Sequence, residues 1–133
     1  MEENINIDPA KIKNQVFNNG KKSPFKDRLA VRGVRQRYIE NVPWERTEYY
    51  KRRIAGKYGN YKTKKEIKKY LRSIDEVYQS MKNEGFIKQG KPIGVAVAKD
   101  GEVCFYHDGQ HRITIAQILK IKSIPVTILK TIQ

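Results

Sequence analysis

Residues 105–119 read Phe-Tyr-His-Asp-Gly-Gln-His-Arg-Ile-Thr-Ile-Ala-Gln-Ile-Leu, and this stretch decides how the last third of the chain folds. Its apolar start predicts a strand that ends at Asp108-Gly109, and its continuation predicts a helix that begins at Gln110. The first backbone N–H groups of a helix have no helical partners, and the helix dipole favours an anion beside them. Because His111 and Arg112 occupy this first turn, we expect the turn to hold a phosphate.

Each residue of the turn has a role that fits this expectation. Gly109 lets the backbone pass close to a ligand, and Arg112 can grip two phosphate oxygens at once. His111 can donate to a phosphate or transfer a proton near neutral pH, and Asp108 can hold a metal ion or act as a base. We therefore predict Gly109, Gln110, His111 and Arg112 as phosphate-binding residues, and Asp108 and His111 as catalytic residues. The alternative is structural: Asp108 caps the helix, Gly109 turns the chain, and His111 and Arg112 are surface residues.

The segments around the turn predict a small α/β module over residues 91–133. Residues 93–98 are apolar and predict a strand, and Lys99-Asp100-Gly101-Glu102 contains the Asp-Gly pair of a tight hairpin. Residues 103–106 form the returning strand, and residues 124–129 form the last one. Pro125 is compatible with an edge strand or with the first residues of a strand.

The clearest helix is predicted over residues 64–84. Thr63 and Glu66 fit a capping box, in which each side chain satisfies a free backbone donor, and Gly85 stands where a helix with a left-handed cap ends. The apolar residues between these limits recur at steps of three and four: Ile67, Tyr70, Leu71, Ile74, Val77, Tyr78 and Met81.

Before this helix the signals are weaker. Residues 29–39 predict a helix despite Gly33, and Trp44 to Ile54, which follow Pro43, predict another. Residues 5–12 predict an extended segment interrupted by a turn at Pro9, and residues 18–27 predict a loop. The sequence thus predicts one α/β (α+β) domain over residues 1–133, in which a small mixed sheet carries a mainly helical, basic insert over residues 28–88.

Most of the net charge of +14 lies outside the module over residues 91–133. Lys11 to Arg72 contain 20 Lys and Arg against 5 Asp and Glu, whereas Lys91 to the end contains 6 against 3. Such a field attracts polyanions, so nucleic acid is a candidate partner. The outer face of the helix over residues 64–84 carries the predicted nucleic-acid-binding residues Lys64, Lys65, Lys68, Lys69 and Arg72. The alternative for this face is a solvated, lysine-rich surface.

Several classes of protein are disfavoured. Cys104 is the only cysteine, which excludes a disulfide within the chain and a four-cysteine zinc site. His107 ends a strand and His111 starts a helix, so the two are not stacked on one helical face, and we predict no metal site from them. No segment resembles a signal peptide or a membrane helix of about 20 apolar residues. We therefore expect a cytoplasmic protein without a membrane partner.

The segment from Ile93 to Leu129 resembles the ParB/sulfiredoxin superfamily. The resemblance is carried by three motifs in the family's order: Asp108-Gly109-Gln110-His111-Arg112, then Ala116-Gln117-Ile118-Leu119, then Ile124-Pro125-Val126. Ile5 to Pro9 is weakly similar to the family's first strand, and the part from Trp44 onward resembles a helical insertion in uncharacterised prokaryotic and viral members. The resemblance implies a sulfiredoxin-like fold in which the Asp108–Arg112 turn binds nucleotide phosphate.

Three departures from the family narrow the activity. Sulfiredoxins have a cysteine where this chain has Gln110, so sulfinic-acid repair is not expected. Partition ParB proteins continue into DNA-binding and dimerisation regions, and this chain stops after the module, so it is not expected to be a complete partition protein. Free-serine kinases of the superfamily use an N-terminal glutamate, for which Glu40, Glu45 and Glu48 are candidates.

Two functions from different classes follow. In the first, the protein binds nucleotide phosphate and acts on a phosphate bond, as an NTPase, a phosphotransferase or a nuclease. A nucleoside triphosphate and Mg²⁺ are then its candidate cofactors. In the second, it is a non-catalytic protein that binds DNA, RNA or another partner through its basic helical face, and the turn is a phosphate docking point.

Overall fold

Within the residues that the structure describes, six strands form one mixed sheet in the order β1-β6-β4-β5-β2-β3. The computed structural model describes residues 3–56, 63–86 and 92–133. The strands are β1 (Glu3–Ile7), β2 (Asn14–Val16), β3 (Lys22–Pro24), β4 (Gly94–Val97), β5 (Val103–Phe105) and β6 (Ile124–Thr131). Strand β6 pairs antiparallel with β1 and parallel with β4, and β5 pairs antiparallel with β4 and parallel with β2. The predicted mixed sheet of an α+β fold is confirmed.

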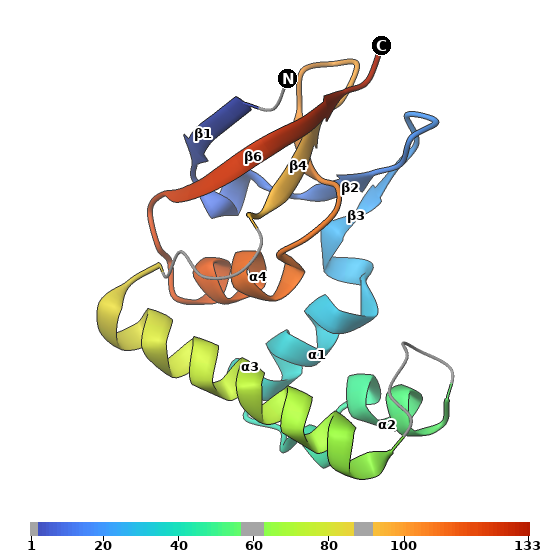
Figure 1. The fold of residues 1–133 in the computed structure, drawn as a ribbon, viewed down its shortest axis with the longest axis vertical. Helices are drawn as coiled ribbons and strands as arrows, with labels where there is room; N and C mark the ends of the chain where they lie inside the picture. Colours follow the sequence, from blue (N-terminus) through green and yellow to red (C-terminus); the bar gives the residue numbers. More distant parts are fainter. Residues whose placement is uncertain (1–2, 57–62, 87–91) are drawn as a thin grey trace.

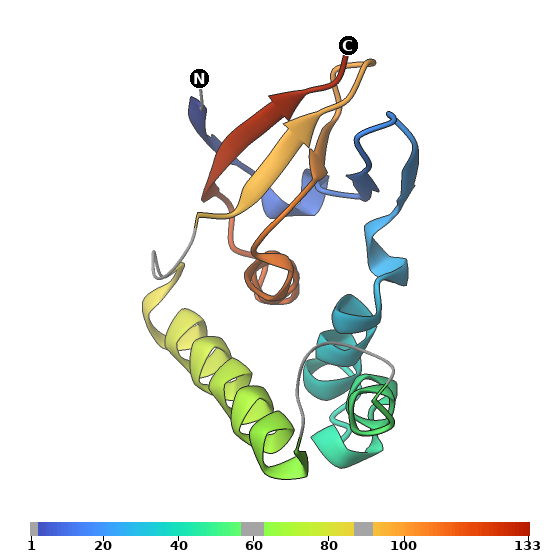
Figure 2. The ribbon, with the colours of Figure 1, turned by 45° about the vertical axis from the view of Figure 1, so that its right-hand side comes forward.

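The helices lie together on one side of this sheet (Figure 1). They are α1 (Leu29–Tyr38), α2 (Glu48–Ile54), α3 (Lys64–Glu84) and α4 (Gln110–Ile118), with short 3₁₀ helices η1 (Pro9–Lys11), η2 (Phe25–Asp27) and η3 (Trp44–Arg46). Helix α4 lies next to the sheet, and in the view of Figure 2 α3 and α1 lie below α4 on either side. None of the helices in the described ranges has the length and apolar composition that a membrane span requires.

One continuous core joins the sheet to the helices. Ile113 and Ile115 of α4 are fully buried, and they share this core with Val95 of the sheet and with Tyr49 and Leu71 of the insert. A smaller cluster on the opposite sheet face contains Val16, Ala96, Ala98, Cys104 and Ile132. Because neighbouring strand residues point to opposite faces, the change from Val95 to Ala96 moves from one cluster to the other. The insert is therefore packed through α4 onto the sheet.

The predicted helix over residues 64–84 is confirmed at both ends. The Glu66 backbone N–H donates to Thr63 Oγ1 at 3.1 Å, and Gly85 follows the last helical residue with a φ of +83°. The Glu66 carboxylate accepts from the Thr63 hydroxyl at 3.2 Å rather than from its backbone N–H, so the cap differs in detail from the expected box. Gly85 has a ψ of −165°, so it is not the left-handed cap that we expected.

Helix α1 is confirmed to within one residue, and Gly33 explains how it packs. A Cβ at Gly33 would lie 2.5 Å from Tyr49 Cβ, so the glycine allows α1 and α2 to approach closely. Gly33, which weakened the helix prediction, thus has a packing role, because its missing side chain leaves room for Tyr49 in the core.

Two predictions are wrong. Residues 18–27 do not form only a loop, because they contain β3 and η2, and β3 is held by antiparallel pairing with β2. Trp44 to Ile54 is not one helix, because Thr47 accepts the Tyr50 N–H and thereby starts α2 after the separate turn η3. Residues 57–62, 87 and 88 of the predicted insert, and Lys91 of the predicted module, lie outside the described residues.

Candidate functional site

The turn that precedes α4 is held against the start of β4. The Asp108 carbonyl accepts the Gly94 N–H at 2.9 Å, and Gly109 has a φ of +101°. A Cβ at Gly109 would lie 2.6 Å from Ile93 Cγ1 and 3.1 Å from Ile93 Cα. Both the backbone angle and the close contact therefore require glycine here.

Gly109 also occupies the N-cap position of α4, where no side chain caps the helix. The structural alternative in which Asp108 caps the helix is therefore wrong. Since an uncapped first turn retains N–H donors for another acceptor, the geometry agrees with the predicted use of this turn.

The His111 ring reaches from this turn to the insert. Its Nε2 lies 3.1 Å from Tyr49 Oη of α2, and its Nδ1 lies 3.4 Å from Tyr70 Oη of α3. Arg53 Nη2 donates to the Tyr49 oxygen at 2.7 Å. The tyrosine hydrogen is then available for His111 Nε2, and the Nδ1–H of a neutral imidazole can donate to Tyr70. His111 thus links α4 to α2 and α3.

The environment of this imidazole disfavours its charged form. Burial lowers the pKa of His111 to about 4, and the positive charges of Arg53, Arg28 and Arg112 act in the same direction. At neutral pH His111 is therefore uncharged.

Arg28 is brought to the turn by Gln110. Its Nε donates to Gln110 Oε1 at 2.6 Å, its Nη1 donates to Gln15 Oε1, and its guanidinium lies 4.8 Å from the centre of the Phe105 ring. The predicted phosphate contact of Gln110 depends on its backbone N–H, and its side-chain oxygen accepts from Arg28. No local signal pointed to Arg28, because it is 82 residues away from Gln110.

Arg53 and Arg112 differ in how deeply they are buried and in what they contact. Arg53 is only 6% exposed, and its guanidinium lies 4.6 Å from the centre of the Tyr49 ring and 4.8 Å from that of Tyr70. Arg112 is half-buried; burial lowers its pKa, and the neighbouring Asp108 carboxylate opposes that shift. The predicted residues Asp108 and Arg112 are thus close enough to interact electrostatically.

The described residues contain no preformed all-protein metal site at this turn. In residues 3–56, 63–86 and 92–133, no group of three or more His, Cys, Asp or Glu side chains could hold a metal ion. Mg²⁺ favours carboxylate oxygens, and at this turn Asp108 lies beside Arg112 rather than beside a second acid. Of the candidate glutamates, Glu48 pairs with Arg32 at 3.1 Å and Arg52 at 3.2 Å, which gives it a structural role.

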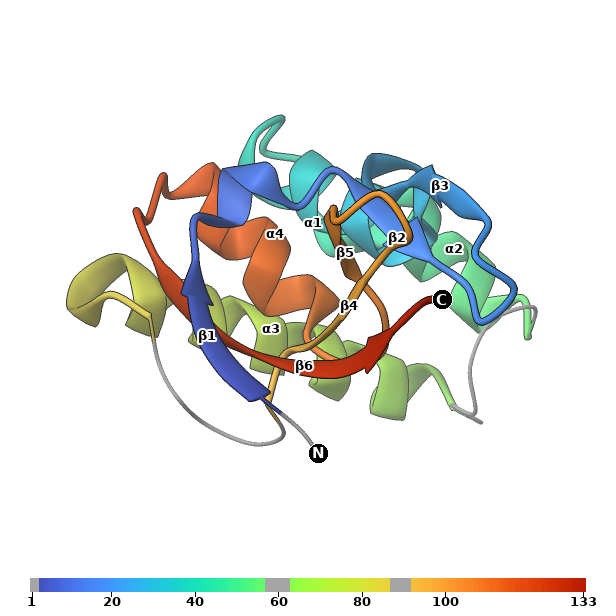
Figure 3. The same cartoon turned by 90° about the horizontal axis from the view of Figure 1, so that it is seen from above.

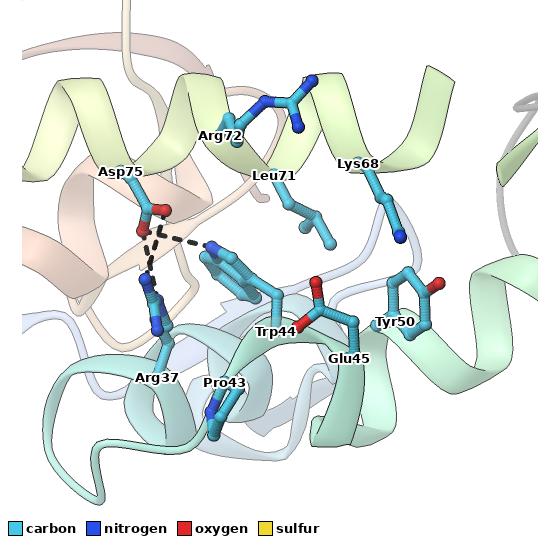
Figure 4. A pocket seen from close by; sticks show the side chains of 9 residues that line it. All are labelled: Arg37, Pro43, Trp44, Glu45, Tyr50, Lys68, Leu71, Arg72 and Asp75. Atoms are coloured by element: carbon cyan, nitrogen blue, oxygen red, sulfur yellow. Dashed lines mark hydrogen bonds and ion pairs between the residues drawn. The ribbon is translucent and has the colours of Figure 1, made fainter. Parts of the chain in front are cut away.

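The predicted nucleic-acid-binding residues lie on the first half of α3. Lys64, Lys65, Lys69 and Arg72 are exposed, Lys68 is half-buried, and none of the five forms an ion pair within the described part of the chain. Lys68 and Arg72 border a cavity of about 230 Å³ between α3 and η3, whose wall includes Trp44 and whose mouth includes Glu45 (Figure 4). The basic face of α3 therefore extends to the edge of this cavity. The acidic side chains of Glu45 and Asp75 also line the cavity.

No protein-family model, curated protein or solved structure matches this chain. The similarity to the ParB/sulfiredoxin superfamily consequently stays a prediction that depends on three sequence motifs.

Proposed function

We propose that this protein binds the phosphate of a nucleotide at the first turn of α4. The observation that carries the proposal is Arg112 on the first turn of α4, with Arg28 held beside that turn by Gln110, next to a helix N-terminus with no side-chain cap. Cations near a helix N-terminus add to the attraction of its N–H groups for an anion. Arginine suits phosphate best among anions because its planar fork can donate to two oxygens at once.

The resemblance to the ParB/sulfiredoxin superfamily supports the same ligand, because its members bind nucleotide phosphates at the corresponding turn. In this chain the turn contains Gly109, which the close contact with Ile93 requires, and Arg112, which is half-buried beside it. A nucleotide ligand also agrees with the predicted cytoplasmic location.

The geometry supports binding more strongly than catalysis. Both ring nitrogens of His111 lie within reach of a tyrosine hydroxyl, and the imidazole is neutral near pH 7. Such a ring is better suited to fix α4 against the insert than to exchange a proton with a ligand. Phosphate-bond chemistry by Asp108 and His111 therefore stays a prediction, and no step is assigned to Mg²⁺.

Calorimetric titration of ATP and CTP into wild type, Arg112→Ala and Arg46→Ala tests the proposal, with and without Mg²⁺. Arg46 is exposed and belongs to η3, so its variant controls for the loss of one positive charge. We expect Arg112→Ala to weaken nucleotide binding at least about tenfold, and Arg46→Ala to change it less than about twofold. Equal affinities in wild type and Arg112→Ala would overturn the proposal.

A second candidate function, nucleic-acid binding by α3, is favoured by its exposed cations, which form no ion pair with the residues that the structure describes. A short DNA duplex titrated at two salt concentrations addresses it. Loss of duplex binding in Lys65→Glu/Lys68→Glu/Lys69→Glu, together with unchanged binding in Arg112→Ala, would favour this second function. Duplex binding that depends on Arg112 would instead place nucleic acid at the turn of α4.

A further inference from the structure

A second hollow, of about 380 Å³, lies away from the first turn of α4, between η1, η2, α1 and the later turns of α4. Figure 3 shows α1 and α4 side by side on this side of the molecule. The floor consists of Ile12, Phe25 and Val31, which are each 1–2% exposed. The bottom of the hollow is therefore apolar and firmly packed.

The rim of this hollow is positively charged. Lys13, Lys26 and Arg35 come from three different segments, all are exposed, and no Asp or Glu lines the hollow. None of the three forms an ion pair with a residue that the structure describes. Ala10 and Pro24 also line the hollow and are exposed, so positive charge and aliphatic surface are both available to a partner.

The side-chain amide of Gln117, which lines the hollow, is already hydrogen-bonded within the protein. Gln117 Nε2 donates to the backbone oxygens of Pro9 at 2.9 Å and of Ile12 at 3.0 Å. These hydrogen bonds fix η1 against α4, so the shape of the hollow is determined by the fold rather than by a ligand.

We propose that this hollow binds an acidic peptide segment, which inserts one aliphatic side chain between Lys13, Lys26 and Arg35. Charge complementarity selects carboxylates for the rim, and the aliphatic floor selects an apolar anchor. A nucleic-acid strand fits less well, because base stacking needs an open aromatic face. Phe25 is 2% exposed and packs on Phe105 with ring centres 5.3 Å apart, so its ring is not available for stacking. The peptide site is independent of the phosphate site.

Fluorescence anisotropy tests the proposal with a labelled nine-residue peptide. The peptide has a central leucine that is flanked by glycines and glutamates. The protein variants are Lys13→Gln/Lys26→Gln/Arg35→Gln and, as a control with the same loss of charge at exposed positions outside both candidate sites, Lys99→Gln/Lys120→Gln/Lys122→Gln. We expect saturable binding by wild type that weakens about tenfold in the first variant and less than about twofold in the control. Replacing the leucine of the peptide by glycine should weaken binding by a further factor of about ten. Unfolding curves establish that both variants fold.

Three outcomes would overturn the proposal. Equal losses in the two variants would mean that binding follows overall charge, and an unchanged affinity for the glycine peptide would mean that no side chain enters the hollow. A single-stranded oligonucleotide that binds more tightly than the peptide, and that depends on Lys13, Lys26 and Arg35, would make the hollow a nucleic-acid surface.

Discussion

Gly109 and His111 are two residues apart, and they connect the candidate phosphate site to the rest of the protein in opposite directions. Gly109 fits against Ile93 at the start of β4, and His111 reaches Tyr49 and Tyr70 in the insert. A change at either residue would therefore alter the site through a contact that lies outside it.

Gly109→Ala is expected to lower the free energy of unfolding by about 2–4 kcal/mol, because alanine disfavours a positive φ and its methyl group would overlap Ile93. Gly101→Ala is a matched control. Gly101 has a similar φ of +89°, but nothing lies within 4 Å of the added Cβ, so only the backbone penalty of about 1 kcal/mol applies. Urea unfolding measures both; equal losses would mean that the contact with Ile93 has no energetic weight.

Stability should fall as the pH is lowered from about 6.5 to about 4, in part because of His111. Its pKa in the folded protein is lowered to about 4, whereas an unfolded histidine titrates near 6.5. Between these values the unfolded chain binds a proton that the folded protein does not, so the stability that the neutral ring contributes above pH 6.5 is lost as the pH falls. We expect a loss of about 2–3 kcal/mol from this group.

His111→Gln isolates that effect, since all other titrating groups remain. The difference in unfolding free energy between wild type and His111→Gln should shrink as the pH falls from 6.5 to 4. The exposed His107→Gln controls for removing an imidazole and should keep the decline of the wild type. A constant difference between wild type and His111→Gln would contradict the prediction.

At the scale of elements, one carboxylate joins α3 to α1 and η3. Asp75 accepts from Arg37 Nε at 3.2 Å, from the Tyr38 hydroxyl at 2.6 Å and from Trp44 Nε1 at 3.1 Å. Figure 4 shows this side chain pointing from α3 toward Arg37 and Trp44. The amphipathic pattern of α3 explains why it packs, and Asp75 helps to explain how its position against η3 is set.

Asp75→Ala should lower the free energy of unfolding by about 2–3 kcal/mol, because it leaves three donors without their acceptor. Glu76→Ala, at the next and exposed position of α3, should change it by less than about 0.5 kcal/mol. Fluorescence of Trp44, the only tryptophan, reports both unfolding and the changed surroundings of the indole. Similar values for the two variants would show that the contacts of Asp75 contribute little.

The crossing of α1 and α2 makes a second prediction at this scale. Alanine normally stabilises a helix interior by about 1 kcal/mol relative to glycine. Gly33→Ala should instead destabilise the protein by about 1–3 kcal/mol, because the new methyl group would lie 2.5 Å from Tyr49 Cβ. Since Tyr49 contacts His111, we also expect weaker nucleotide binding.

Asn83→Ala, at an exposed position of α3, is the comparison for Gly33→Ala and should be neutral or slightly stabilising. Urea unfolding and nucleotide titration provide the two measurements. If Gly33→Ala raised the stability, the close approach of the two helices would be wrong.

At the scale of the whole molecule, the net charge of +14 opposes the compact state through repulsion. Sodium chloride should therefore raise the melting temperature of every variant by screening that repulsion. Sodium phosphate at the same ionic strength should raise it further in wild type, by about 5 °C at a tenfold excess over the dissociation constant, if the anion binds the folded state alone.

This additional stabilisation should be absent from Arg112→Ala and present in Arg46→Ala. Differential scanning calorimetry of the three proteins separates general salting effects, which all three share, from binding at the first turn of α4. An equal phosphate effect in all three proteins would argue against an anion site at Arg112.

The parts of the fold that could be predicted are those whose signals are local. Helix α3 begins at a threonine cap and carries an apolar stripe, and α4 follows an Asp-Gly turn. Strands β2 and β3 were missed because each has only three residues, too few for a clear alternation of apolar and polar side chains. Strand β2 is stabilised by pairing with β5, which lies far away in the sequence.

In the candidate site, too, local features could be predicted from the sequence and long-range contacts could not. The sequence by itself determined the turn, the glycine and the helix that starts beside His111 and Arg112, because caps, turns and periodicity act over a few neighbouring residues. Only the tertiary structure decided that His111 meets Tyr49 and Tyr70, and that Arg28 contacts Gln110. These contacts arise where α1, α2 and α3 pack around α4, and packing depends on the shapes of surfaces that are distant in sequence.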